Sequence, residues 1–352
     1  MKRIKRITSI VTLIVVLFTM ALSFTSCSKE EKVTLNVYNW GEYIDESVIK
    51  EFEQRYGIKV NYETYATNEE MYTKVKSGGT AYDIVIPSDY MVAKMIREGL
   101  LEKLDFSNIP NYKYIDPKFK NRDFDPNNEY TVPYMWGTVG IAYNKKMVTD
   151  PVDSWNILWN EKYKGQILML DSQREAIGLT LKKLGYSLNT TDKNALEKAK
   201  QELIKQKPLV LAYAVDEIKD KMIANEAALA VDWAGNAVCM KRQNPDIEFA
   251  IPKEGSNLFI DCMVIPKTSK HKKEAEMFIN FMCETAIAKK NVEYIGYSTP
   301  HTEVYKLLDE KIKNDKTIYP DEETLNRCEI YKDLSDYLSE YDRIWTEVKA
   351  SN

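Results

Sequence analysis

The sequence predicts an α/β protein of two lobes with mainly parallel sheets, and three observations lead to this prediction. Predicted strands alternate with predicted helices along the chain, which is the pattern of a parallel sheet. The strand predicted over residues 82–86 is apolar except for Asp83, typical of a strand buried on both faces. The pattern restarts after a polar stretch at residues 116–129, and 352 residues exceed the usual size of a single core.

The first half of the chain contains three predicted strands, each followed by a predicted helix. Alternating β-branched residues predict the first strand, and Asp45 and Gly57 mark the start and end of the helix that follows it. Two glycines, Gly78 and Gly79, end the second helix in the same way. The predicted strands cover residues 33–38, 58–62 and 82–86, and the helices cover residues 45–56, 68–77 and 91–98.

The second half repeats the alternation without a flexible linker. Strands are predicted over residues 139–143, 166–170, 209–213, 228–233, 247–251 and 259–265. Helices are predicted over residues 175–184, 192–206, 217–224 and 272–283, and the chain after His301 is mostly helical. Two α/β units without a linker indicate lobes joined by strand-like crossings, with a ligand bound between them at the carboxyl ends of the strands.

The first residues have the pattern of a lipoprotein signal peptide. Four basic residues among residues 2–6 precede an uncharged apolar stretch at 7–24, and small residues then precede Cys27. We therefore expect residues 1–26 to be a signal peptide, Cys27 to be lipidated, and residues 27–32 to be a tether. An uncleaved membrane anchor is the alternative, and either one places the rest of the chain outside the cytoplasm, attached to the cell membrane. No later segment has the ~18 apolar residues that a membrane span needs.

The charge and the chemical motifs exclude several classes of protein. The net charge is −4, and cleavage before Cys27 removes four basic residues and makes it −8. A mildly acidic chain is a poor partner for nucleic acid, so we expect none. The sequence has none of the phosphate-binding, nucleotide-binding, serine-hydrolase or zinc-protease motifs, and neither His271 nor His301 is placed as a catalytic base.

Cysteine and histidine are too sparse for a metal site. Only two histidines are present, and no two cysteines have the C-x-x-C spacing, so we expect no metal and no cofactor. Isolated cysteines in apolar surroundings are usually buried small side chains, although one or two disulfides remain open outside the cell. The four cysteines after the tether are Cys239, Cys262, Cys283 and Cys328.

Aromatic residues beside polar or acidic ones recur at the ends of predicted strands. Aromatic faces attract organic cations and cover methylene chains, and carboxylates form charge-assisted hydrogen bonds with ammonium groups. Any one of these residues alone could pack in a core or cap a helix, so the argument depends on their recurrence. The residues are Trp40, Glu42 and Tyr43; Ser88 and Tyr90; Asp171 to Glu175; Asp232 and Trp233; Phe259 and Asp261; and Tyr297.

Eight segments of the chain, taken in order, match a known pattern. They are YNWGEY (38–43), AYDIVIPSDY (81–90), FDPNNEYTVPYMWG (124–137), LKKLGYSLNTTD (181–192), WAGNA (233–237), PKEG (252–255), IGYSTP (295–300) and NDKTIYPD (314–321). Together they resemble the bacterial spermidine/putrescine-binding proteins of polyamine ABC importers. The resemblance extends from about residue 33 to the C-terminus.

The resemblance implies a two-lobed periplasmic-binding-protein fold of type II, with mainly parallel sheets and a hinge of two crossings. It implies no catalysis and no cofactor, a polyamine ligand, delivery to a permease with its ATPase, and a monomer. Lobe 1 would comprise residues 33–137 plus 263–303, and lobe 2 residues 138–262 plus 304–352. The ligand-binding residues carried over by position are Trp40, Glu42, Tyr43, Ser88, Tyr90, Ser172, Glu175, Trp233, Phe259, Asp261 and Tyr297.

The sequence departs from the family pattern at several of these positions. Gly41 stands where a hydroxyl residue is typical, and Ser172 stands where spermidine binders place an aspartate, with Asp171 adjacent. Asn236 stands where some putrescine binders have an aspartate, and a glutamine expected near Tyr331 is missing. These departures leave the choice between spermidine and putrescine open.

Three other interpretations also stay open from the sequence. The same fold could hold another cationic or neutral solute, the scaffold could carry an extracellular enzyme, or the chain could be an adhesin. Three acids and five aromatic residues at matched positions argue against an anionic ligand, because anion sites favour Arg, Lys and helix N-termini.

Overall fold

The structure, a computed structural model, describes residues 33–351, and residues from Thr34 onward form one compact unit. The predicted signal peptide, the lipidated Cys27 and the tether lie outside the described residues. No helix in the described part of the chain is long and apolar enough to cross a membrane.

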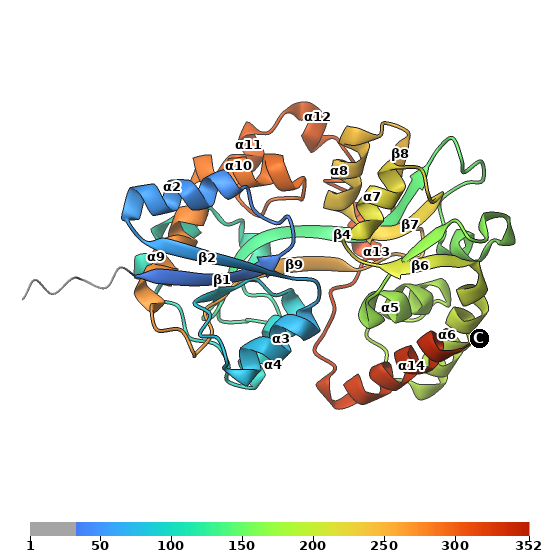
Figure 1. The fold of residues 1–352 in the computed structure, drawn as a ribbon, viewed down its shortest axis with the longest axis horizontal. Coiled ribbons are helices and arrows are strands. Elements are labelled where there is room, and N and C mark those ends of the chain that lie inside the picture. Colours follow the sequence, from blue (N-terminus) through green and yellow to red (C-terminus); the bar gives the residue numbers. More distant parts are fainter. Residues whose placement is uncertain (1–32, 352) are drawn as a thin grey trace, which may run out of the picture. The chain divides into compact units, whose positions relative to one another are not determined.

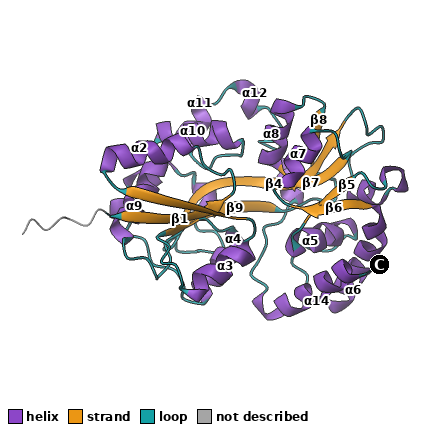
Figure 2. Ribbon diagram, in the orientation of Figure 1, coloured by secondary structure: helices purple, strands orange, loops and turns teal. Residues whose placement is uncertain are grey.

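Nine strands and thirteen α-helices make up residues 34–350 (Figures 1 and 2). The strands are β1 (Thr34–Trp40), β2 (Lys59–Tyr65), β3 (Ile84–Val85), β4 (Val132–Asn144), β5 (Ile167–Leu170), β6 (Val210–Ala214), β7 (Leu229–Trp233), β8 (Ile247–Ala250) and β9 (Leu258–Met263). The helices of the first half are α2 (Glu46–Tyr56), α3 (Asn68–Ser77) and α4 (Asp89–Arg97). Those of the second half are α5 (Gln173–Lys183), α6 (Lys193–Gln206), α7 (Glu217–Ile223), α8 (Ala234–Gln243), α9 (Lys272–Met282), α10 (Thr285–Ile295), α11 (Thr302–Leu307), α12 (Glu310–Lys313), α13 (Glu322–Arg327) and α14 (Leu338–Ala350).

The strands form two sheets, and the second contains one long strand, β4. The first sheet has the order β2-β1-β3 and is parallel throughout. In the second, β6, β5 and β7 are parallel, and β4 joins β7 and β8 antiparallel. The first half of β4 pairs with β9 instead, so β4 and β9 run from one part of the molecule to the other (Figure 1).

The helices begin and end at the residues that physical chemistry favours. The Asp45 side chain accepts the backbone N–H of Ser47 at the start of α2, and Gly57 ends that helix at φ 69°. Thr67 caps α3 and Ser172 caps α5 in the same way. Each cap fixes where a helix starts relative to the strand before it, and α5 consequently begins beside the site described below.

Buried apolar residues form three clusters. The first surrounds β1 and β3 and includes Phe52 and Phe278, the second surrounds β5 and β7, and the third joins α5 and α6 to α14. Besides the crossings by β4 and β9, the chain passes from the first cluster to the third once more, between Leu308 and Tyr341. This third passage is irregular around Tyr331 and brings that side chain back to the middle of the molecule.

The structure confirms the predicted alternation and corrects several elements. The strand predicted over residues 139–143 is the second half of β4, which begins at Val132. Its first half was missed because Pro133 and Gly137 normally argue against a strand, and the pairing register shifts at Pro133. Two helices, α8 and α10, were also missed, since neither has a side-chain cap to mark its start.

Candidate ligand-binding site

One cavity of about 540 Å³ lies where the two sheets approach each other, and this volume is typical of a small-molecule site. All the predicted ligand-binding residues line it, although they come from six separate parts of the chain. They are Trp40, Glu42, Tyr43, Ser88, Tyr90, Ser172, Glu175, Trp233, Phe259, Asp261 and Tyr297. The structure thus brings the predicted set together, while its role in binding stays a prediction.

Asp261 lies on the crossing strand β9 and is 4% exposed. Its carboxylate accepts hydrogen bonds from the Ser88 hydroxyl (2.6 Å) and the Tyr43 hydroxyl (2.7 Å). Burial raises the pKa of Asp261 to about 6, although both hydrogen bonds act in the opposite direction. Both partners are neutral, so the carboxylate is held in position without a counter-ion.

Glu175 follows the capping residue of α5 and is 7% exposed. Its two oxygens accept hydrogen bonds from the side-chain amide of Asn257 (3.0 Å) and the hydroxyl of Tyr331 (3.1 Å). Burial raises the pKa of Glu175 to about 7, against the effect of these hydrogen bonds. A second buried carboxylate in the same cavity is therefore also held by neutral donors. Ser172 serves as the cap of α5, with its hydroxyl accepting the N–H of Glu175.

A layer of aromatic rings lies around Asp261. The Tyr297 ring meets Tyr43 edge-on at a centroid distance of 5.2 Å and Phe259 at 5.9 Å. Gly235, near the start of α8, makes this packing possible, because a Cβ there would overlap the Tyr297 ring. The Tyr297 hydroxyl also donates to Asn236 at 3.4 Å.

Two half-buried tryptophans and Tyr90 complete the aromatic lining. Trp40, the last residue of β1, donates its indole N–H to the carbonyl of Ile86 at 2.8 Å, which fixes the ring at the strand end. Trp233 is the last residue of β7 and packs against both of the larger apolar clusters. The Tyr90 hydroxyl donates to the Glu69 carboxylate at 3.0 Å.

Glu42 differs from the other two predicted carboxylates. It adopts φ 51° in the turn after β1, and its side chain is 71% exposed. Its carboxylate forms an ion pair with the ammonium group of Lys219 on α7, which also lines the cavity. The resemblance predicts that Glu42 holds a ligand amino group, whereas here a side chain of the protein provides its cation.

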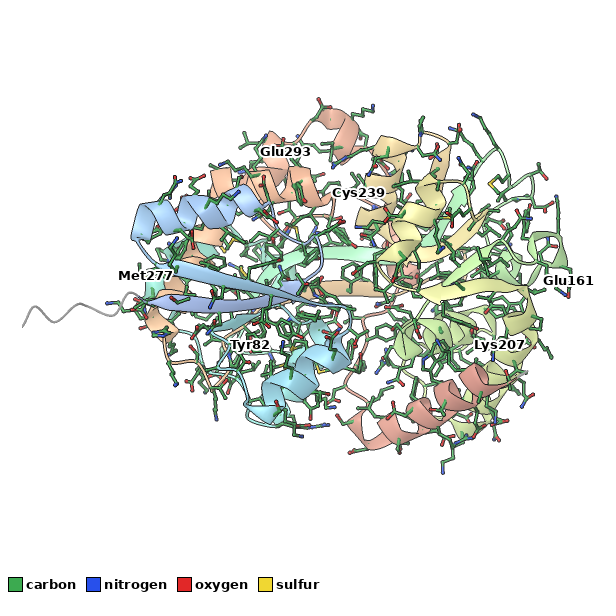
Figure 3. The ribbon with its side chains drawn as sticks, in the orientation of Figure 1. Tyr82, Glu161, Lys207, Cys239, Met277 and Glu293 are labelled. Carbon is green, nitrogen blue, oxygen red and sulfur yellow. The ribbon has the colours of Figure 1, made fainter. Side chains whose placement is uncertain are left out.

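The cysteine and histidine side chains make local contacts within the fold. All four cysteines of the described chain are free, and none of its Cys, His, Asp and Glu residues gather in a group that could hold a metal. Cys239 on α8 bonds to the backbone carbonyl of Ile295, at the edge of the cavity that also includes Glu293 on α10; both side chains are labelled in Figure 3. His301 is buried, where its Nδ1 caps α11.

Sequence reasoning missed several residues of the cavity. Asn257 and Tyr331 hold Glu175 from positions 82 and 156 residues away along the chain. Tyr331 reaches Glu175 because Gly178 has no side chain, and a Cβ there would overlap the tyrosine hydroxyl. Lys219 and Asp216 also line the cavity and could have been suspected, since they follow the end of β6 as Trp40 follows β1.

The arrangement suits an extended organic cation. Two buried carboxylates lie among aromatic rings, and a ring face and a carboxylate both favour an ammonium group. Both histidines of the described chain lie outside the cavity, and the Ser88 hydroxyl that donates to Asp261 belongs to its lining. Two α/β parts joined by crossing strands around such a cavity define a two-lobed solute-binding protein.

The chain belongs to the bacterial extracellular solute-binding protein family, whose model matches residues 47–320. It is 40% identical to the spermidine/putrescine-binding periplasmic protein of Escherichia coli, over 94% of this chain and 96% of the relative. A solved structure from Listeria monocytogenes, provisionally described as a spermidine/putrescine ABC transporter, is 47% identical, with a TM-score of 0.88 over 91% of this chain and 99% of that one. The spermidine/putrescine ABC transporter substrate-binding protein of Streptococcus pneumoniae is 44% identical, with a TM-score of 0.78 over 90% and 99%. These similarities confirm the predicted two-lobed periplasmic-binding-protein fold with mainly parallel sheets.

Proposed function

We propose that this protein is the extracytoplasmic substrate-binding component of an ABC importer and that it reversibly captures a polyamine, spermidine or putrescine. The observation that carries the proposal is the pair of buried carboxylates, Asp261 and Glu175, whose hydrogen-bond donors are all neutral. A buried carboxylate without a counter-ion is costly, and a ligand ammonium group would remove that cost. The names of the relatives point to the same ligand class.

Each part of a polyamine has a matching part of the cavity in this proposal. Ammonium groups would pair with Asp261 and Glu175, and the methylene chain between them would lie against aromatic rings. Ser88 acts as a positioning residue, because its hydroxyl holds Asp261. The rings that would enclose the methylenes are Trp40, Tyr43, Tyr90, Trp233, Phe259 and Tyr297.

We propose that the ligand is taken up by closure of the two lobes. Lobe 1 would comprise residues 33–137 plus 263–303, and lobe 2 residues 138–262 plus 304–352, with β4 and β9 as the hinge strands. Hinge closure around a ligand is common in binding proteins, and closure would desolvate and strengthen the ion pairs. The packing of Val304 and Leu308 in the first cluster indicates that the boundary after residue 303 lies a few residues further on.

The proposal includes the attachment and the partner of the protein. Cys27 would be acylated after removal of residues 1–26 and would anchor a monomer to the membrane beside the permease and its ATPase. No chemical step is part of this function, and no cofactor is required. Processing of the full-length chain that is blocked by globomycin and by Cys27→Ser would support the anchor. Processing that continues with the inhibitor and in the variant would contradict it.

Isothermal titration calorimetry tests the ligand class. The soluble chain from Ser28 onward, unfolded and refolded to remove any co-purified amine, is titrated separately with spermidine and putrescine. Binding in the micromolar range or tighter to either amine supports the proposal. Absence of heat with both amines, from protein with a cooperative thermal transition, would exclude polyamine capture.

A further inference from the structure

The ion pair between Lys219 and Glu42 joins two parts of the chain that lie on opposite sides of the cavity. Glu42 follows β1 of the first sheet, and Lys219 lies on α7, which packs beside β7 of the second sheet. The Lys219 side chain is 15% exposed, whereas Glu42 is 71% exposed. The lysine is thus the enclosed member of the pair, and it lines the cavity.

The surroundings of Lys219 keep it charged. Burial alone lowers the pKa of this ammonium group, but the hydrogen bond and the charge of Glu42 outweigh burial and raise it. Asp216, one turn earlier, adds a second negative charge, and its carboxylate approaches Gly41 so closely that a Cβ there would lie 3.2 Å from Oδ2. Gly41 therefore admits an acidic side chain from α7 where a larger residue would not.

We propose that Lys219 is a specificity-determining residue that occupies, as a tethered ammonium group, the cation position beside Glu42. The inference depends on the proposed polyamine function and concerns which polyamine fits. With Glu42 already paired, Asp261 and Glu175 remain as the buried carboxylates of the cavity that are held by side-chain donors. The buried Asp89, which also lines the cavity, accepts the backbone N–H groups of Tyr90 and Ile260. Two carboxylates match the two ammonium groups of a diamine, and Lys219 repels the third ammonium group of a triamine at this end of the cavity.

Titration calorimetry of four variants with spermidine and putrescine tests the role of Lys219. Lys219→Met and Lys219→Gln remove the charge, Lys219→Arg keeps it, and Lys221→Met removes a lysine of the same helix that pairs with Glu226 outside the cavity. We expect the affinity for spermidine relative to that for putrescine to rise about tenfold in Lys219→Met and Lys219→Gln. The ratio should stay at its wild-type value in Lys219→Arg and Lys221→Met.

A double variant tests whether Lys219 acts through its pairing with Glu42. If Lys219 acts by occupying the position beside Glu42, the gain for spermidine in Lys219→Met requires Glu42. The double variant Lys219→Met/Glu42→Gln should then lose most of that gain. A gain that persists in the double variant would show that Lys219 acts by repulsion alone, without occupying a ligand position beside Glu42, and would overturn the proposal.

The outcomes distinguish this inference from the proposed function. Wild-type protein that binds neither amine contradicts polyamine capture itself. If the wild-type protein binds an amine but both charge-removing variants keep the wild-type ratio of dissociation constants, the inference alone is overturned. Equal losses for both amines in Lys219→Met and Lys219→Gln, with unchanged thermal transitions, would assign Lys219 a role in closure instead of specificity and would also overturn it.

Discussion

The carboxylates in two regions of the cavity differ in their burial and in their partners. In the interior, Asp261 and Glu175 are almost fully buried, and hydroxyl and amide groups are their hydrogen-bond donors. At the edge, Glu42 is largely exposed and has the Lys219 ammonium group beside it. The interior carboxylates form no ion pair with a side chain of the described residues and have raised pKa values, although the charge of Arg174 acts against the rise at Glu175, while the edge carboxylate already has its counter-ion.

The difference shows how a binding protein can separate affinity from stability. A buried carboxylate without a counter-ion destabilises the empty protein, and the same group gains most when a cation arrives. An exposed ion pair contributes little to either quantity, since water screens it. Affinity for a cation should therefore depend chiefly on the interior pair, and the predictions below test this comparison from the largest effect to the smallest.

Replacement of Asp261 should have the largest effect. Asp261→Asn keeps the shape and removes the charge, and loss of one member of a buried charge pair costs about 2–5 kcal/mol, so the polyamine Kd should rise at least about 30-fold. Calorimetry measures the change. Asp246→Asn is the matched control, because Asp246 pairs with Lys146 outside the cavity and should leave the Kd unchanged. Normal affinity in Asp261→Asn would remove Asp261 from the site.

Acid should weaken binding strongly, because the interior carboxylates must be ionised to pair with a cation. The pKa of Glu175 is raised to about 7 and that of Asp261 to about 6, so both become protonated as the pH falls from about 8 to about 5. We expect polyamine affinity to fall at least about tenfold over this range. Affinity independent of pH would mean that ionised interior carboxylates do not hold the ligand.

The stability of the ligand-free protein should change with pH in the opposite sense to the polyamine affinity. A carboxyl group with a raised pKa in the folded state favours folding when protonated, so its contribution is full below its unfolded pKa and is lost as the pH rises through about 6 for Asp261. Asp261→Asn lacks this titration. The free energy of unfolding of the variant relative to wild type should therefore rise between about pH 4 and pH 8, which denaturant titrations at each pH can measure. A constant difference would contradict the raised pKa of Asp261.

Removal of one aromatic face should have an intermediate effect. Trp233→Ala deletes a ring at the end of β7, and an aromatic–cation contact contributes ~0.5–2 kcal/mol, so the Kd should rise roughly 3- to 30-fold. Trp345→Ala removes a partly buried tryptophan of the third cluster, away from the cavity, and should leave the Kd unchanged. Equal losses in both variants would indicate a general loss of structure, which far-ultraviolet circular dichroism would detect.

Sequence patterns predicted the architecture because local chemistry determines it. Asp45 and Gly57 mark the ends of α2, and the apolar run around β3 indicates burial. Several predicted ligand-binding residues gather at one cavity because they lie at or after strand ends, which the topology brings together, while Phe259 and Asp261 lie within the crossing strand β9.

Long-range partners could not be predicted in the same way. The pairing of Glu42 with Lys219 joins residues 177 apart, and Tyr331 reaches Glu175 from an irregular segment 156 residues away. Both depend on the packing of the complete fold: Tyr331 needs the space that Gly178 leaves open. The sequence indicated which residues carry charge near the site, but which carboxylate lacks a counter-ion appears only in three dimensions.

Replacement of Glu42 should have the smallest effect and is the direct counterpart of Asp261→Asn. Glu42→Gln removes a carboxylate that is 71% exposed and already paired, so we expect the Kd for putrescine to change by less than about fivefold. Calorimetry of Glu42→Gln and Asp261→Asn under the same conditions gives the comparison. A loss in Glu42→Gln as large as that in Asp261→Asn would mean that the ligand displaces Lys219 and takes Glu42 for itself. In that case the edge and the interior of the cavity would act as one site, and the contrast between them would hold for the empty protein alone.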